Sequence, residues 1–429
     1  MKVKAMECSY LFLCLYVKCL RLFFYPNLTL HTLSSQLYIH ETSLSKLENG
    51  KWATKSNIAI LLKFYNLSTI KEKKGQAFCT VTNDSLLFDD NRLKEIICNK
   101  TEEIINDFFN INKSVNKEIL IQPDSIYLPL NVIHFYILEL SKETTDKRTK
   151  NINKIEKILL NIKNQLFGDL KFICLLGLSY SYYKNGDYYA SLELINEVLV
   201  DDTLDLRLEI IAHYYLLQVS NCIEDFVTSI ETTSKLKSLL KNYPNDYKLL
   251  QLQGQIANTY LLFGDLKRSH DYLILGLELS KKISKNQFSI FAYNIGWNLN
   301  LQKKYEEAIK YYSLSAEVYI DTATCFEIAW CYFCLNNKDG AIKYIKISRD
   351  KTTASYKSYM PLFCDWLDAM INKPYSKKCL KILFKLEKKY IKSMHPESKR
   401  FLYSLLSKHL SNIGDYKQAL EYSLMIIDT

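Results

Sequence analysis

A short turn recurs between residues 186 and 414 of this chain at a nearly constant interval. Its clearest copy is Asn185-Gly186-Asp187-Tyr188, which separates two segments that each have the apolar periodicity of a helix. Counted at the position of Gly186, the copies lie at residues 186, 224, 264, 303, 336, 373 and 414, with steps of 38, 40, 39, 33, 37 and 41 residues. Self-similarity at this interval predicts stacked helical hairpins. Such an array buries its core between neighbouring hairpins and exposes an extended concave groove.

The hairpins resemble slightly lengthened tetratricopeptide repeats, which form a right-handed helical superhelix. Gly296, Ala308, Ala341 and Ala419 occupy the small-residue positions at which the two helices of a hairpin approach each other. The resemblance also implies that the first helix of each hairpin lines the groove. The residues predicted to bind a ligand there are Tyr214, Gln218, Asn221, Asn258, Tyr293, Trp297, Asn300 and Trp330.

This set of predicted groove residues combines aromatic rings with carboxamides and contains no acid. Carboxamides donate to and accept from a peptide backbone, and aromatic rings hold apolar side chains, so the set favours a short, apolar, extended peptide. An aromatic stripe at helical spacing can equally be core. Asn221, Asn258 and Asn300 are the stronger candidates, because a carboxamide gains little from burial in a core.

Three short amphipathic helices are predicted between Leu28 and Leu67. The segment contains Leu28-Thr29, Ile39 and the run Thr42-Ser43-Leu44-Ser45-Lys46-Leu47-Glu48-Asn49-Gly50-Lys51. In these residues it resembles the helix-turn-helix of lambda-repressor and Cro, the XRE family, over about 40 residues. This resemblance implies a compact bundle whose second motif helix enters the major groove of double-stranded DNA.

The same resemblance implies a role for each polar residue of that recognition helix. The helix would start near His40. Its side chains Glu41, Thr42 and Lys46 would face base edges, since residues i and i+4 share a face. The residues that would contact the DNA backbone are Ser43, Asn49 and Lys51.

Two positions depart from the family pattern. Leu30 stands where the family commonly has glutamine after the Leu-Thr pair. The arginine that usually pairs with the glutamate at Glu48 would fall at Phe23, whereas Arg21 lies two residues earlier. Either the first helix is shifted, or Glu48 has another partner.

Composition agrees with an all-α protein and with a polyanionic partner. Hydrophobic residues make up 48% of the chain, and Gly (11) and Pro (7) are scarce, so long helices are expected. The net charge is +10, and residues 1–66 carry eight Lys or Arg against three Glu. This basic balance suits DNA, although a basic solvated surface would give the same count.

Other classes of function find little support in the sequence. The 12 cysteines form no disulfide framework and indicate a reduced, cytoplasmic protein, with Cys331 and Cys334 expected in the core. The apolar run near Met1 is shorter than the ~20 residues of a membrane span and is expected to be a buried helix. No metal site, cofactor motif or catalytic motif is present, so no enzymatic activity is predicted.

Taken together, three regions are predicted: a helix-turn-helix domain at 1–67, a linker with short helices at 68–127, and the repeat array at 128–429. This arrangement resembles the peptide-responsive transcription regulators of Gram-positive bacteria, the PlcR and Rgg type. The resemblance implies a homodimer that binds DNA and a short signalling peptide. Two alternatives stay open: the array contacts another protein, or the protein is a repeat scaffold whose helix-turn-helix binds no DNA.

Overall fold

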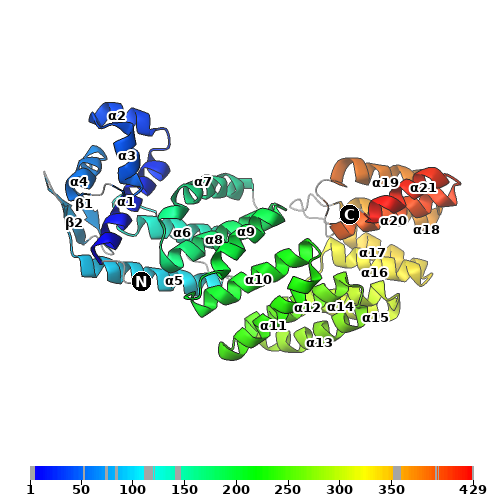
Figure 1. The fold of residues 1–429 in the computed structure, drawn as a ribbon. Helices are drawn as coiled ribbons and strands as arrows, with labels where there is room; N and C mark the ends of the chain where they lie inside the picture. Colours follow the sequence, from blue (N-terminus) through cyan, green and yellow to red (C-terminus); the bar gives the residue numbers. More distant parts are fainter. Residues whose placement is uncertain are drawn as a thin grey trace. The chain divides into compact units, whose positions relative to one another are not determined.

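The computed structural model describes residues 5–51, 54–72, 76–82, 86–110, 119, 121–140, 146–350, 359–391, 394 and 396–427. Within these ranges the protein is helical apart from one small sheet (Figure 1), which confirms the all-α class. The chain forms two compact units, Met1–Tyr243 and Pro244–Thr429. The boundary between these units lies inside the predicted array of 128–429. Each unit is described by itself.

The first unit begins with four helices, and three of them lie where short helices were predicted. The four are α1 (Ala5–Phe24), α2 (Leu30–Leu37), α3 (Glu41–Glu48) and α4 (Lys55–Phe64). Each short helix is preceded by a capping residue whose side chain accepts a hydrogen bond from a backbone N–H of the first turn. These residues are Thr29 for α2, His40 for α3 and Thr54 for α4. The turn between α2 and α3 passes through Tyr38, which has φ of 55° and a side chain that is 96% exposed.

Helix α1 is the apolar run near the N-terminus, and the nine residues 12–20 are all buried, as the sequence predicts. A helix that is apolar on every side needs partners on every side. The partners are α3 and α4 within the bundle and, beyond it, α5, α6 and α7 of the same unit, defined below. The bundle is therefore packed onto the first helices of the array.

Arg21 on α1 forms a bidentate ion pair with Glu48 on α3. Its Nε lies 2.6 Å from Oε1 and its Nη2 lies 2.7 Å from Oε2, and Glu48 is 2% exposed. Arg21 also donates to the carbonyl of Leu28 at 3.2 Å. Of the two possibilities left by the sequence, the first holds: α1 is shifted so that Arg21, not position 23, reaches the glutamate.

In the region expected as a linker, 68–127, the described residues include strands and a long helix that pack within the first unit. It contains a three-stranded antiparallel sheet in the order β1-β2-β3, followed by the 20-residue helix α5. Ile70, Cys79 and Leu86 are buried under the sheet, and β2 and β3 contact α4. Strands this short give no readable alternation in sequence, which is why a polar, turn-rich linker was expected. The elements are β1 (Thr69–Lys71), β2 (Ala77–Val81), β3 (Leu86–Leu87) and α5 (Asp90–Phe109).

The rest of the first unit consists of helices that pack in sequence order, beginning close to the predicted residue 128. Sequential pairs such as α8 with α9 and α10 with α11 make the closest contacts. These helices are α6 (Leu128–Leu140), α7 (Asp146–Ile162), the 3-10 segment η2 (Lys163–Gln165), α8 (Gly168–Lys184), α9 (Tyr188–Leu199), α10 (Leu206–Cys222) and α11 (Phe226–Asn242).

The second unit is built from five further helical pairs. Successive helices pack as antiparallel hairpins, and α14 with α15 is the most closely associated pair. Two continuous apolar cores run through the unit, one around Phe291 and Tyr312 and one around Phe363 and Leu402. The helices are α12 (Asp246–Leu262), α13 (Leu266–Ile283), α14 (Lys285–Leu301), α15 (Tyr305–Val318), α16 (Thr322–Cys334), α17 (Lys338–Asp350), α18 (Met360–Asn372), α19 (Lys377–Tyr390), α20 (Pro396–Asn412) and α21 (Tyr416–Ile427).

The recurring turn has one backbone geometry throughout the array. A residue in the left-handed conformation follows the first helix. In six copies the backbone N–H of the residue after it donates to the carbonyl five residues earlier, as from Asp265 to Tyr260 at 2.9 Å. In the copies with Asp187, Asp225 or Asp265 at that next position, the aspartate caps the second helix, so one short turn ends one helix and starts another. The left-handed residues are Gly186, Glu224, Gly264, Lys303, Asn336, Tyr375 and Gly414.

One predicted turn is displaced. The sequence placed it at residue 373, but the left-handed residue is Tyr375, with φ of 53°. The spacing from Asn336 to Tyr375 is 39 residues, and from Tyr375 to Gly414 it is again 39. No glycine marks this turn, so its position could not be read from composition.

Small residues allow the close approach of helices that the repeat pattern predicts. A Cβ at Gly296 would lie 2.8 Å from the ring of Tyr312, and Ala308 is fully buried beside it. Among the described helices, none combines the length and the apolar character that crossing a membrane requires.

Candidate functional site

Helix α3 presents the polar face on which DNA contacts were predicted. His40, Glu41, Thr42 and Lys46 are all exposed, and Ser43 is half-buried. The Nδ1 atom of His40 lies 2.8 Å from the Thr42 hydroxyl, which fixes the first turn of the helix. Leu44 and Leu47 are buried on the opposite face. The first turn and the last turn of α3 therefore both carry side chains that solvent, or a partner, can reach.

Asn49 is exposed, and its side chain also forms hydrogen bonds to neighbouring elements. Its Oδ1 accepts from Lys18 Nζ at 3.1 Å and also from Gln165 Nε2, and its Nδ2 donates to Ser45 at 3.4 Å. Lys18 additionally donates to the carbonyl of Asn161 at 2.8 Å. Asn49 thus links the end of α3 to α1 and to η2 while the residue itself stays exposed, so a contact from Asn49 to DNA remains a prediction. Lys51 is exposed just beyond.

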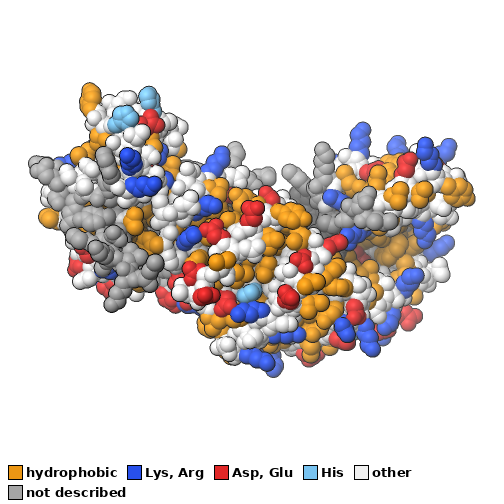
Figure 2. Space-filling model, viewed as in Figure 1, with side chains coloured by type: hydrophobic (Ala, Val, Ile, Leu, Met, Phe, Trp, Pro, Cys, Tyr) orange, Lys and Arg blue, Asp and Glu red, His pale blue; other side chains and the backbone are white. Residues whose placement is uncertain are grey.

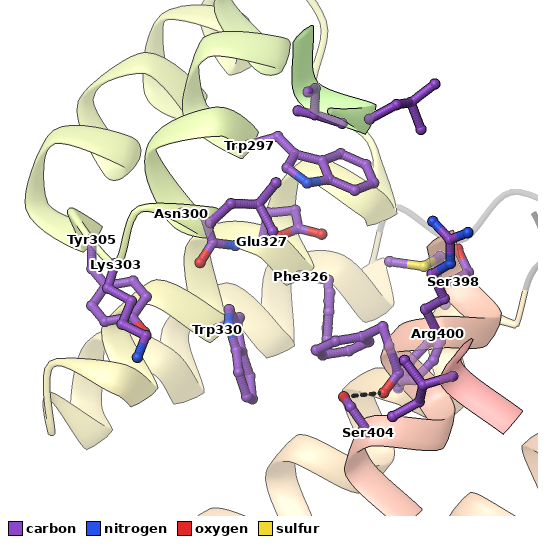
Figure 3. A pocket seen from close by; sticks show the side chains of 17 residues that line it. Trp297, Asn300, Lys303, Tyr305, Phe326, Glu327, Trp330, Ser398, Arg400 and Ser404 are labelled. Atoms are coloured by element: carbon purple, nitrogen blue, oxygen red, sulfur yellow. Dashed lines mark hydrogen bonds between the residues drawn. The ribbon is translucent and has the colours of Figure 1, made fainter. Parts of the chain in front are cut away.

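A pocket of about 550 Å³ opens in the second unit between helices of several hairpins (Figure 3). Most of its wall is aromatic or aliphatic. Trp297 and Trp330 stand on α14 and α16, and Phe401 on α20 packs edge to face on Trp330 with ring centroids 5.4 Å apart. Its lining residues are Leu261, Leu262, Trp297, Asn300, Leu301, Lys303, Tyr305, Phe326, Glu327, Trp330, Met360, Phe363, Ser398, Arg400, Phe401, Ser404 and Ile426.

One carboxylate lies within this apolar wall. Glu327 on α16 accepts from Asn300 Nδ2 at 3.1 Å and from the Tyr312 hydroxyl at 3.4 Å, and Figure 3 shows it next to Asn300. Burial raises the pKa of Glu327 to about 7, against the opposing effect of the two hydrogen bonds. Asn300 therefore does two things in the pocket: it holds Glu327 and contributes to the lining.

A second, smaller cavity of about 130 Å³ adjoins the first, since Leu261 and Trp297 line both. It lies between α12, α13 and α14, and its walls are more polar. The lining residues are Gly254, Ala257, Asn258, Leu261, Ser269, Leu273, Asn294 and Trp297. None of these side chains carries a charge.

Four of the predicted groove residues meet at these two cavities. Asn258 is exposed at the smaller one, and Trp297, Asn300 and Trp330 line the larger one. Tyr293 stands behind them, because its ring packs edge to face on Trp297 at 6.5 Å between centroids.

The other three predicted groove residues belong to the first unit, on α10. Asn221 does not face a groove as predicted, because it is only 3% exposed. Its Oδ1 accepts from the Ser229 hydroxyl at 2.9 Å, so it joins the two helices of its own hairpin. Tyr214 is likewise buried, at 6% exposure, which identifies it as core. Gln218 is half-buried.

The sequence did not point to several residues that form the pocket. Glu327 was missed because its repeat position was not among those expected to face the groove. Met360, Arg400 and Phe401 come from α18 and α20, and no pattern within one hairpin shows which later hairpin will face it. The high aromatic content of these segments was the one sequence feature that could have indicated a pocket there.

One group of side chains in the first unit has a composition that could hold a metal ion. Ligand atoms of Glu103, Asp107 and His134 lie within 4.8 Å of one another. However, Lys100 Nζ lies 2.8 Å from Glu103, and Asp107 Oδ2 accepts from His134 Nε2 at 2.7 Å. Burial and the Lys100 ammonium lower the pKa of His134 to about 4, so the imidazole is neutral at pH 7. The lysine supplies the positive charge that a cation would otherwise provide.

Glu327 leads to a testable pH dependence. Its folded pKa of about 7 exceeds the ordinary value of 4.5, so ionising it costs stability as pH rises from about 4.5 to 7, and the full cost remains above 7. We expect Glu327→Gln to be more stable than the wild type at pH 8, on the order of 2 kcal/mol, and nearly equal to it at pH 5. Urea denaturation at the two pH values measures this difference. The same difference at both would show that the carboxyl is not destabilising in its ionised form.

Comparisons with solved structures find the same fold at low sequence identity. A Rap protein complexed with competence and sporulation factor aligns with a TM-score of 0.59 and 12% identity, over 78% of this chain and 97% of that chain. The quorum sensor NprR in complex with its cognate peptide NprX gives 0.54 and 14%, over 78% and 98%. Aspartyl phosphate phosphatase F from Bacillus subtilis gives 0.53 and 13%, over 79% and 92%. No family model and no curated protein matches the sequence.

Proposed function

We propose that this protein is a DNA-binding transcription regulator whose helical repeats bind a short peptide. The observation that carries the proposal is the aromatic pocket of about 550 Å³ in a repeat fold. Two neighbours with that fold are described as complexes with a signalling factor or a cognate peptide. A pocket of this size with apolar walls and few polar groups is typical of small-ligand sites.

The pocket chemistry favours a short peptide that is mainly apolar. Trp297, Trp330 and Phe401 offer flat apolar surfaces, and Asn258 and Asn300 offer amide groups at its edge. Amides pair with peptide N–H and C=O groups, while the rings take up apolar side chains. A peptide laid across Trp297 would reach both cavities.

The DNA-binding part of the proposal rests on α3. The exposed Thr42 and Lys46 are one helical turn apart, so they share a face that can enter a major groove. Lys and Arg side chains lie beside this region on the face shown in Figure 2, and His side chains lie at its tip. Because helix-turn-helix proteins bind paired half-sites as dimers, the regulator proposed here acts as a homodimer.

A second candidate is that the array contacts another protein. Helix α21 supports it, because Tyr416, Leu420 and Leu424 recur at four-residue intervals and are 71%, 61% and 52% exposed. An exposed apolar stripe on one helix face fits a protein partner.

The test is selection of bound DNA from a random pool by the full chain, with and without culture supernatant. A selected consensus that strengthens or weakens with the supernatant supports the proposal. A consensus that does not respond favours the protein-partner candidate, and the lack of any consensus contradicts DNA reading by α3.

Two lysines should separate base reading from phosphate contact on the selected DNA. We expect Lys46→Ala to weaken specific binding by about 1–3 kcal/mol while changing nonspecific binding little. Lys51→Ala should weaken both alike and lower the slope of log affinity against log salt by about one. Fluorescence anisotropy over a salt series measures both. Equal losses on the two DNAs for Lys46→Ala would move Lys46 to the phosphate contacts.

A further inference from the structure

The smaller cavity contains a buried hydroxyl that lacks a protein partner. Ser269 on α13 is 0% exposed, and no hydrogen bond to its Oγ is formed by any residue that the structure describes. Ser269 is one of the residues that line the cavity of about 130 Å³. A buried hydroxyl normally finds a partner in the protein or in bound solvent.

Equivalent serines elsewhere in the array do have partners. Ser269, Ser191 and Ser229 each lie five residues after the left-handed residue of their turn. The Ser191 hydroxyl donates to the carbonyl of Ser179 at 2.9 Å, and the Ser229 hydroxyl donates to Asn221 Oδ1 at 2.9 Å. A serine at this turn position can therefore form a hydrogen bond within the protein. Ser269 differs from the other two in that it lines a cavity.

Two carboxamides also line the cavity: Asn258 is exposed and Asn294 is half-buried. Together with Ser269 they provide donors and acceptors without any charge. Trp297 and Leu261 connect this cavity to the larger apolar pocket.

We propose that the smaller cavity is a specificity subsite for one neutral, hydrogen-bonding side chain of the bound peptide, of the size of Ser, Thr or Asn. This proposal rests on the proposed peptide-binding function. The volume corresponds to about four water molecules at about 30 Å³ each, which suits a side chain of few atoms. A charged side chain is disfavoured, because the lining offers no opposite charge to a buried ion. An apolar side chain would leave the buried Ser269 hydroxyl unpaired.

The experiment uses the full chain and a positional-scanning library of pentapeptides with free termini. In each mixture one position is fixed as Ser, Thr, Asn, Ala, Val, Asp or Lys, and the shift in Tm on binding is recorded. We expect one position at which Ser, Thr or Asn gives the larger shift. Single peptides made from that result should bind about tenfold more tightly than their Ala counterparts, the gain of about one hydrogen bond.

Ser269→Ala tests the assignment to this cavity. The variant should reduce the tenfold preference to about twofold or less, while its own Tm in the free state stays equal to the wild type or rises. Ser191→Ala is the matched control, because its hydroxyl is already bonded: it should lower Tm and leave the preference intact.

Three outcomes would overturn the proposal. If peptides bind with no neutral polar preference at any position, or if the preference survives Ser269→Ala, the cavity holds solvent alone, and the proposed function stands. If no mixture shifts Tm at all, the subsite and the peptide-binding function fail together.

Discussion

Glu48→Gln should lower the free energy of unfolding by about 3 kcal/mol. The substitution preserves size but leaves the guanidinium of Arg21, 11% exposed, without its counter-charge. Breaking one side of a buried ion pair typically costs about 3–5 kcal/mol, because the remaining charge stays desolvated. Urea denaturation of the full chain measures the loss.

The matched control for this effect is Glu278→Gln on α13. Glu278 lies 2.7 Å from Lys281, but both side chains are more than half exposed. An exposed pair contributes about 0–1 kcal/mol, so the control should change stability little. If Glu48→Gln also costs less than about 1 kcal/mol, the Arg21 pair does not hold α1 against α3. Because that pair positions α3, the destabilised variant should also lose DNA affinity.

Trp297→Ala should weaken peptide binding by about a hundredfold. Its indole forms part of both cavities and is supported from behind by Tyr293. Truncating a central aromatic residue of a binding site commonly costs 2 kcal/mol or more, and a hundredfold loss is about 2.7 kcal/mol. Isothermal titration with the tightest-binding pentapeptide of the library measures the change.

Two further variants make the Trp297 result specific. Trp297→Phe should recover part of the affinity, because a smaller ring still covers the junction between the cavities. Tyr319→Ala removes a ring that is 60% exposed and outside both cavities, so it should bind like the wild type. Wild-type affinity in Trp297→Ala, with unchanged Tm, would place the peptide elsewhere on the array.

Local sequence patterns predicted most of the secondary structure. A turn that ends one helix with a left-handed residue and starts the next with a capping aspartate depends on few neighbouring residues, so copies such as Gly264-Asp265 were readable directly. The same reasoning missed Tyr375, because tertiary packing there holds a tyrosine in a conformation that glycine usually adopts. It also missed the small sheet, whose strands are too short to show a pattern.

Asn221 and Asn300 show where the sequence stops being informative. Both lie three residues before the left-handed residue of their turns, so the repeat pattern treats them alike. In the structure Asn221 is buried against Ser229, whereas Asn300 donates to Glu327 in the pocket. The contact of Asn300 is with a residue of the next hairpin, so it cannot be inferred from the pattern of one repeat.

The sequence by itself determined the all-α class, the places of the short helices near the N-terminus and the interval of the hairpins. These features follow from interactions between residues close in the chain: caps, turns and helical periodicity. Only the tertiary structure decided that Arg21 pairs with Glu48, that the small sheet and α5 pack within the first unit, and that α14, α16, α18 and α20 line one pocket. Each of these depends on contacts between residues far apart in sequence, where the gain from burial and charge pairing outweighs local preference.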